Sequence, residues 1–161
     1  MNIVIKGFNK QQIIAIEQIS ATINKIPKHH LIGLECIVYD PQRFYQRSYV
    51  SPKTINYRAS GQYDNSPINY ISIYKFNSFD EFTHILHHEI GHHVYTKLLN
   101  SFERKQWVTQ ISSKYAYISD YAKKNAAEDF AECYAYFHLK PEQLKSLSTK
   151  YDFIRKFCSE F

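Results

Sequence analysis

Five of the chain's eight histidines lie in the stretch HILHHEIGHHVY, residues 84–95, and Glu89 is the one acidic residue among them. In a helix, His88 and His92 are one turn apart, so both imidazoles can reach a single cation. Two neutral imidazoles leave a zinc ion strongly Lewis acidic, and a water on it can then lose a proton to a neighbouring carboxylate near neutral pH. The spacing HEIGH therefore indicates one zinc ion at which Glu89 acts as general base.

No other pair in this stretch offers the same arrangement. Pairing His84 with His88 places Ile85 where the base should be, and pairing Glu89 with His93 makes the carboxylate itself a ligand. The five-residue pattern also arises by chance in helices that bind no metal, where its Glu is ion-paired at the surface. A metal site therefore needs a third ligand elsewhere in the chain.

The third ligand is not supplied by the residues that directly follow the pattern. A glycine three residues after His92 and a histidine six residues after it would be one solution, but Tyr95 and Leu98 occupy these positions. The segment NAAEDFAECYAYF instead offers Glu128 and Glu132 on one face of a predicted helix, away from its apolar side chains. The sequence predicts that these carboxylates point toward the metal.

The same segment also fits a purely structural role. Asn125 followed by Glu128 matches the start of a helix, with Asn at the cap and Glu in the first turn. Asp129 is expected only to favour the positive N-terminus of this helix. Spacing alone does not decide whether Glu128 is a metal ligand or a capping residue.

Two stretches, HHEIGHH and SDYAKKNAAEDFAE, together resemble the catalytic domain of anthrax lethal factor and the Pro-Pro endopeptidases, a gluzincin branch of zinc metallopeptidases. In that family a Tyr and a Glu stand seven residues apart, as Tyr121 and Glu128 do here. The resemblance implies a zincin-like fold, Glu128 as third zinc ligand and Tyr121 as hydrogen-bond donor to the transition state. It covers residues 87–137 firmly and 68–76 loosely, and nothing before about residue 60 matches.

Further side chains are predicted to support the site without binding the metal. Glu132, one turn after Glu128, suits a carboxylate that fixes a ligand histidine or Tyr121, although a surface position fits equally. His84 is predicted to lie next to the metal ligands. His87 and His93 are expected to support the ligands, to pack or to lie at the surface.

The helix that carries the histidines is predicted over residues 78–99. Ser78 and Glu81 form a capping-box pattern at its start. Its two faces differ, because apolar residues recur at every fourth position on one side and histidines on the other. The apolar face comprises Phe82, Leu86, Ile90, Val94 and Leu98, and the histidine face comprises His84, His88 and His92.

Hydrophobic patterning predicts the remaining elements. Isoleucines at helical spacing predict a first helix over residues 10–24. Strands are predicted at 31–40, 54–58 and 68–76, with the turn-rich segment GQYDNSP before the last of them. From residue 78 to the end the pattern is helical, with breaks near residue 100 and between 115 and 125. Strands followed by helices predict an α+β fold with a small N-terminal sheet and a mostly helical C-terminal half.

Composition limits the class of protein. With 161 residues, 44% of them hydrophobic and 22% charged, the chain fits one soluble domain over 1–161. The net charge of +5 is spread over scattered Lys and Arg, which favours solvated helix faces over nucleic-acid binding. We expect no membrane partner, because no apolar run approaches about 18 residues.

Location is inferred from signals at the N-terminus and from the cysteines. The start MNIVIKGFNKQQ lacks a standard export signal, and the three cysteines include no CxxC pair. A disulfide framework and a thiolate zinc site are therefore not expected. We expect a cytoplasmic protein, or one delivered to another cell without a standard signal peptide.

The sequence thus predicts a zinc metalloendopeptidase, a hydrolase acting on a protein or peptide substrate. Two rivals remain: a zinc-binding interaction or toxin-like module without turnover, and an intracellular regulator-cleaving metallopeptidase that shares only HExxH and a later Glu. A basic nucleic-acid adaptor is a weaker alternative. The predicted strand 68–76 either pairs with an extended substrate backbone or is an ordinary sheet strand.

Overall fold

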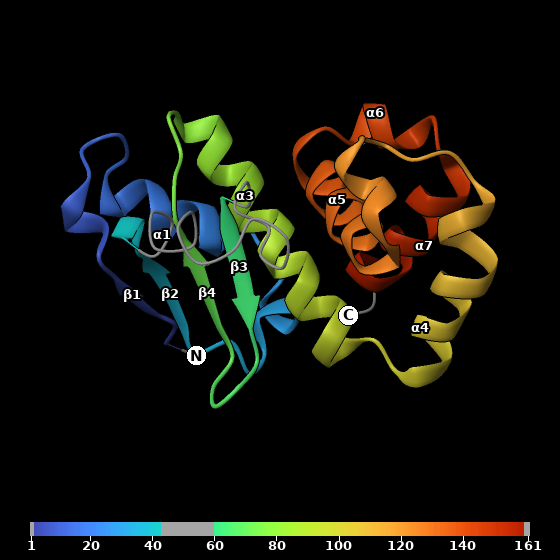
Figure 1. Cartoon of the computed structure of the whole chain (residues 1–161), viewed down its shortest axis with the longest axis horizontal. Helices are drawn as coiled ribbons and strands as arrows, with labels where there is room; N and C mark the ends of the chain where they lie inside the picture. The colour runs from blue at the N-terminus through green and yellow to red at the C-terminus, as the bar shows by residue number, and fades with distance from the viewer. Residues whose placement is uncertain (1, 43–59, 160–161) are drawn as a thin grey trace. The chain divides into compact units, whose positions relative to one another are not determined.

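The computed structural model describes residues 2–42 and 60–159 (Figure 1). Its chain divides into two compact units, Met1–Glu89 and Ile90–Phe161. The first unit contains a four-stranded mixed sheet with helices, and the second is helical. These elements confirm the predicted α+β class.

The sheet belongs to the first unit and has the strand order β1-β2-β4-β3. β1, β2 and β4 run parallel, whereas β3 is antiparallel to β4. Among the described residues, β3 therefore pairs on one side only, and β4 lies in the interior between β2 and β3. The strands are β1 (Val4–Lys6), β2 (Cys36–Tyr39), β3 (Gly61–Asp64) and β4 (Tyr70–Ile73).

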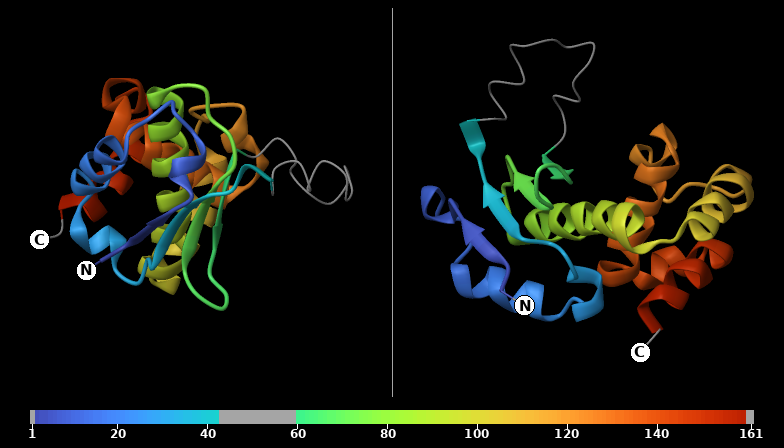
Figure 2. Two further views of the ribbon diagram at one scale, coloured as in Figure 1. Left: turned by 90° about the vertical axis from the view of Figure 1, so that its left-hand side faces the viewer. Right: turned by 90° about the horizontal axis from the view of Figure 1, so that it is seen from below.

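One face of this sheet is covered by α1 (Ile16–Asn24) and by the first part of α3 (Phe79–His93), as Figure 2 shows. The core lies between these helices and the strands, because every second strand residue points toward them. Fully buried side chains in this core are Ile19, Ile37, Ile71, Ile73, Phe82 and Leu86. Two short 3₁₀ helices, η1 (Phe8–Lys10) and η2 (Lys28–Leu31), complete the described part of the unit.

The first helix is shorter than predicted. Its predicted start is instead a loop organised by Gln11, whose amide donates to the carbonyls of Phe8 and Ile14. The side-chain oxygen of Gln11 accepts from the backbone N–H groups of Ile13 and Ile14. A side chain that satisfies the local backbone in this way removes the need for a helical turn, so α1 begins only at Ile16.

Two of the three predicted strands are present, and both are shorter than predicted. β2 occupies the second half of the predicted range 31–40, and β4 occupies the middle of 68–76. The predicted strand 54–58 lies outside the described residues. The GQYDNSP segment was predicted as a turn, but its first four residues form β3. The cause is tertiary, since Gly61–Asp64 gains a ladder of hydrogen bonds to β4, with Gly61 opposite Ile73.

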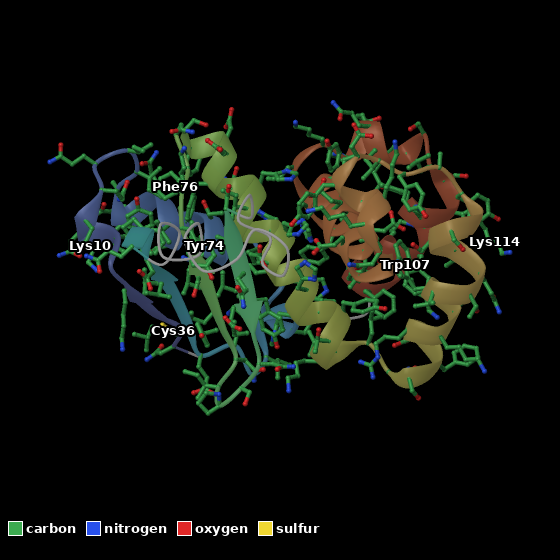
Figure 3. The ribbon with its side chains drawn as sticks, in the orientation of Figure 1. Lys10, Cys36, Tyr74, Phe76, Trp107 and Lys114 are labelled. Atoms are coloured by element: carbon green, nitrogen blue, oxygen red, sulfur yellow. The ribbon has the colours of Figure 1, made fainter. Side chains whose placement is uncertain are left out.

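The second unit contains α4 and α5, which are followed by two further helices at its C-terminal end. Trp107, labelled in Figure 3, is fully buried there and stacks edge-on against Phe130 at 5.3 Å. Its indole N–H donates to the carbonyl of Ala126 at 2.8 Å. The elements are η3 (Val94–Leu98), α4 (Ser101–Gln106), η4 (Trp107–Ile111), η5 (Ser112–Lys114), η6 (Tyr121–Lys124), α5 (Ala126–Leu139), α6 (Pro141–Lys145) and α7 (Ser148–Ser159).

Helix α3 forms as its sequence predicts. Ser78 Oγ accepts from the backbone N–H of Glu81, and the Glu81 carboxylate accepts from the N–H of Asn77. The helix continues from His93 into the π-helical turn η3, which ends at Leu98. The apolar face is buried, with Leu98 partly exposed at its end. Within the described ranges, no helix combines the length and the apolar character that crossing a membrane requires.

Candidate metal centre

The two histidines of the HEIGH stretch lie on α3 one turn apart, in one unbroken helix. His88 is buried, and the side chain of His92 is 18% exposed. Because the boundary between the two units falls inside this helix, the helical backbone alone fixes His88 relative to His92. α3 thus presents two imidazole ligands at the spacing that one cation needs.

Glu128 lies in the first turn of α5, in the same unit as His92. Its backbone N–H donates to Asn125 Oδ1 at 2.9 Å, so Asn125 is the N-cap of the helix. Its carboxylate turns to α3 instead, with Oε2 at 3.1 Å from His92 Nε2. The two roles that spacing left open for Glu128 are therefore compatible, because its backbone joins the cap and its side chain faces the histidine.

His88, His92 and Glu128 together form a group that could hold a metal ion. One ligand atom of each lies within 4.8 Å of the others. Tetrahedral zinc with bonds of about 2.0–2.1 Å separates its ligand atoms by about 3.3 Å, which is close to the distance of 3.1 Å between His92 and Glu128. Two imidazoles and one carboxylate are also a donor set that leaves a coordination position for water on zinc.

The distance between α3 and α5 depends on Gly91. A Cβ atom at this position would lie 2.8 Å from Cα of Ala131, 3.1 Å from its carbonyl oxygen and 3.1 Å from Cβ of Tyr134. Two of these atoms are backbone, which cannot move aside without moving the helix. Glycine at position 91 therefore permits the close approach that brings Glu128 to His92.

Glu89, the predicted base, is 6% exposed and packs against β3 inside the first unit. A methyl group at Gly61 would lie 2.8 Å from Cγ2 of Ile85 and 3.0 Å from Oε1 of Glu89. A side chain at position 61 would therefore crowd the carboxylate of Glu89, which lies next to this end of β3. The position of Gly61 beside Glu89 was not predicted from the sequence, because Gly followed by polar residues is typical of a turn.

Tyr121 is the first residue of η6, the short helix that precedes Asn125 and α5. η6 packs directly against α5. The ring of Tyr121 is partly exposed, and Nζ of Lys124 lies 3.6 Å from the ring centroid. The tyrosine predicted from the family spacing is therefore on the element next to the helix that carries Glu128.

Glu132 follows Glu128 by one turn on α5 and is 5% exposed. Its Oε2 accepts a hydrogen bond of 2.6 Å from the hydroxyl of Ser119. The predicted partners were a ligand histidine or Tyr121, so Ser119, two residues before Tyr121, is a partner that the sequence analysis did not anticipate. No local sequence pattern predicts this hydrogen bond, because Ser119 and Glu132 are 13 positions apart.

The other histidines of α3 differ in environment. His84, one turn before His88, is partly exposed, and His93 is fully buried. The Nδ1–H of His87 donates to the carbonyl of Thr83 at 2.7 Å. Burial lowers the pKa of His87, which favours the neutral ring. His87 and His93 thus have the buried environment of packing residues.

Asp129 has a role that differs from the predicted one. It is fully buried, and both of its carboxylate oxygens accept from Nζ of the equally buried Lys150 on α7, each at 2.8 Å. Burial raises the pKa of Asp129, and the Lys150 ammonium opposes this rise. Asp129 was predicted only to favour the positive N-terminus of its helix. That prediction was incomplete, because the ion pair with Lys150 also joins α5 to α7.

Comparisons of the chain with protein families, with curated proteins and with solved structures find no match.

Proposed function

We propose that this chain is a zinc-dependent endopeptidase, in which His88, His92 and Glu128 hold the metal. The observation that carries the proposal is the meeting of three suitable donor atoms within 4.8 Å. Glu89 adds a buried carboxylate on the same helix as the two histidines. A site that only stabilises the fold needs no such additional carboxylate, so its presence favours catalysis.

Zinc at these ligands would supply Lewis acidity, which brings the pKa of a water close to neutrality. Glu89 is the residue that would accept a proton from the attacking water and pass it to the leaving amine. Gly61 assists because it leaves room for this carboxylate, which a side chain at position 61 would crowd. The hydroxyl of Tyr121 donates a hydrogen bond to the oxygen on which negative charge develops.

The zincin-like fold and the relationship to lethal factor and the Pro-Pro endopeptidases belong to this proposal. They are supported by the resemblance of residues 87–137 and by a sheet that packs on the helix with the histidines. Of the two alternatives for the strand 68–76, the ordinary sheet strand is favoured over the substrate-pairing strand, because β4 has a neighbour on each side. An extended peptide would add to β3 instead, whose first residue lies against Glu89.

Three other functions make different predictions. A zinc-binding interaction module would bind metal and show no turnover, and a nucleic-acid adaptor would bind in a salt-dependent manner after metal removal. A regulator-cleaving metallopeptidase would keep the metal site but not the dependence on Tyr121. The substrate in the proposed function is a protein or peptide, with no role for nucleic acid or membrane.

The proposal is tested by metal analysis and peptide-library cleavage with the wild-type chain and Glu89→Gln. We expect one zinc per chain in both proteins, because position 89 is not a ligand. Turnover should fall by about 10²- to 10⁴-fold in the variant, since a neutral amide cannot accept the proton. His88→Ala serves as control and should lose zinc as well as turnover. Undiminished cleavage by Glu89→Gln, or no cleavage of any peptide by zinc-loaded wild type, would contradict the proposal.

A further inference from the structure

Ser119 connects two elements of the second unit through a single hydroxyl group. Its O–H donates to Oε2 of Glu132 on α5 at 2.6 Å. The same oxygen accepts from the backbone N–H of Ala122 in η6 at 3.2 Å. The hydroxyl is therefore used as donor and acceptor at once, which fixes the orientation of its Cβ–Oγ bond.

The acceptor of this hydroxyl is a carboxylate with little access to water. Glu132 is 5% exposed, so a charge there depends on hydrogen-bond donors supplied by the protein. A hydroxyl that donates to a carboxylate over 2.6 Å is in the short range typical of charge-assisted hydrogen bonds. Loss of the Ser119 hydroxyl would leave one carboxylate oxygen without this donor.

The element attached in this way is short. η6 comprises only Tyr121–Lys124, and the side chain of its N-cap residue, Asp120, makes no capping hydrogen bond. Ala122, whose N–H takes part in the connection, is fully buried, whereas Lys123 and Lys124 are exposed. A four-residue 3₁₀ turn has little stability of its own, so its position depends on its attachment to α5.

We propose that Ser119 and Glu132 form a tether that positions Tyr121 for the reaction. This inference rests on the proposed function, in which the Tyr121 hydroxyl meets the developing oxyanion. α5 carries Glu128 in its first turn and Glu132 one turn later, so one helix sets both the metal ligand and, through Ser119, the start of η6. Ser119 and Glu132 are positioning residues and touch no reacting atom.

A kinetic cycle tests the tether. Ser119→Ala should lower kcat by about 10- to 100-fold with nearly unchanged KM and zinc content, because a displaced donor affects mainly the transition state. Ser119→Thr keeps the hydroxyl and should restore most of the rate. In the background of Tyr121→Phe, Ser119→Ala should have almost no further effect, since the tether then has no hydroxyl to position.

Amide hydrogen exchange gives a second readout that needs no activity. Loss of one hydrogen bond of about 1 kcal/mol should speed exchange at Ala122 about fivefold in Ser119→Ala. Exchange in α4 should stay unchanged as an internal control. Glu132→Gln retains a carbonyl acceptor and most of the packing, so it should show the same changes to a smaller extent and replaces Ser119→Ala if that variant does not fold.

The outcomes separate the tether from the proposed function. Unchanged exchange at Ala122, a Ser119→Ala rate within about twofold of wild type, or rate losses that multiply with those of Tyr121→Phe would overturn the tether. A zinc-loaded wild type without any cleavage would overturn the proposed function. In that case faster exchange at Ala122 would still show that the serine holds η6, but for a different purpose.

Discussion

Helices α3 and α5 carry the candidate metal ligands, but different forces hold them in place. α3 is positioned by apolar packing, with Phe82, Leu86 and Ile90 fully buried along one face. In the second unit it approaches α5 closely at Gly91, where a Cβ atom would overlap the backbone of Ala131. Hydrophobic contacts of this kind are non-directional and tolerate small changes in charge or hydrogen bonding.

The first half of α5 is positioned mainly by polar interactions. Asn125 caps its start, Asp129 binds the ammonium of Lys150, and Glu132 accepts from Ser119. Such interactions are directional, and a buried polar group that loses its partner is costly. The difference implies that polar substitutions should disturb Glu128 while leaving the two histidines in register, and that the histidine helix should respond chiefly to changes in volume.

The largest effect on stability is expected at the buried ion pair. Lys150→Met leaves the Asp129 carboxylate buried without its cation, which should lower the free energy of unfolding by about 3–5 kcal/mol. Urea denaturation measures this change. The double variant Asp129→Leu/Lys150→Met should recover most of the loss, because a well-packed apolar pair replaces both charges.

Lys123→Met is the matched control for this pair. Lys123 also forms an ion pair, with Asp120, but the two side chains are 60% and 95% exposed. Its removal should leave the unfolding transition nearly unchanged, because water screens exposed pairs. Equal effects of Lys150→Met and Lys123→Met would show that α5 does not depend on its buried polar contacts.

A smaller effect is expected from added volume at Gly91. In an exposed helix Gly→Ala stabilises by about 1 kcal/mol, but here the new methyl group would overlap Ala131 and cost about 1–3 kcal/mol. Gly91→Ala should therefore be destabilising and should weaken zinc binding, since α3 and α5 must separate. Thermal unfolding and zinc titration measure the two changes.

Ala131→Gly sharpens this prediction. The obstructing atoms include Cα and the carbonyl oxygen of Ala131, which glycine retains. The double variant Gly91→Ala/Ala131→Gly should consequently bind zinc no better than Gly91→Ala alone. Recovery of zinc binding in the double variant would mean that side-chain packing, and not the approach of the two backbones, sets the distance between the helices.

Local patterns allowed much of the ligand arrangement to be predicted. The two faces of α3 and the caps at Ser78 and Asn125 depend on residues within one or two turns, and these elements formed as expected. β3 and the start of α1 were predicted wrongly, because pairing with β4 and the hydrogen bonds of Gln11 overrode local propensity. β1 was missed altogether, since a three-residue strand carries almost no period-2 signal.

The supporting interactions around the ligands could not be predicted, because their partners are distant in sequence. Asp129 and Lys150 are 21 positions apart, and Ser119 and Glu132 are 13 positions apart. Lysine and glutamate are ordinarily surface residues, so composition gave no reason to expect Lys150 and Glu132 to be buried. Sequence patterns thus indicated which carboxylate could face a histidine. The interactions that hold the helix of this carboxylate in place are tertiary contacts, which local patterns do not predict.

The smallest effect is expected at the cap of α5, and it separates stability from metal binding most clearly. Asn125→Ala removes the acceptor of the Glu128 N–H and should cost about 1 kcal/mol. Asn100→Ala removes the equivalent acceptor of the Glu103 N–H at the start of α4, with a similar cost. Both variants should shift the urea midpoint alike, but only Asn125→Ala should weaken zinc binding, because its cap holds the turn that carries Glu128. Equal zinc affinities in the two variants would mean that Glu128 is kept in place by its contact with His92, and not by the N-cap of α5.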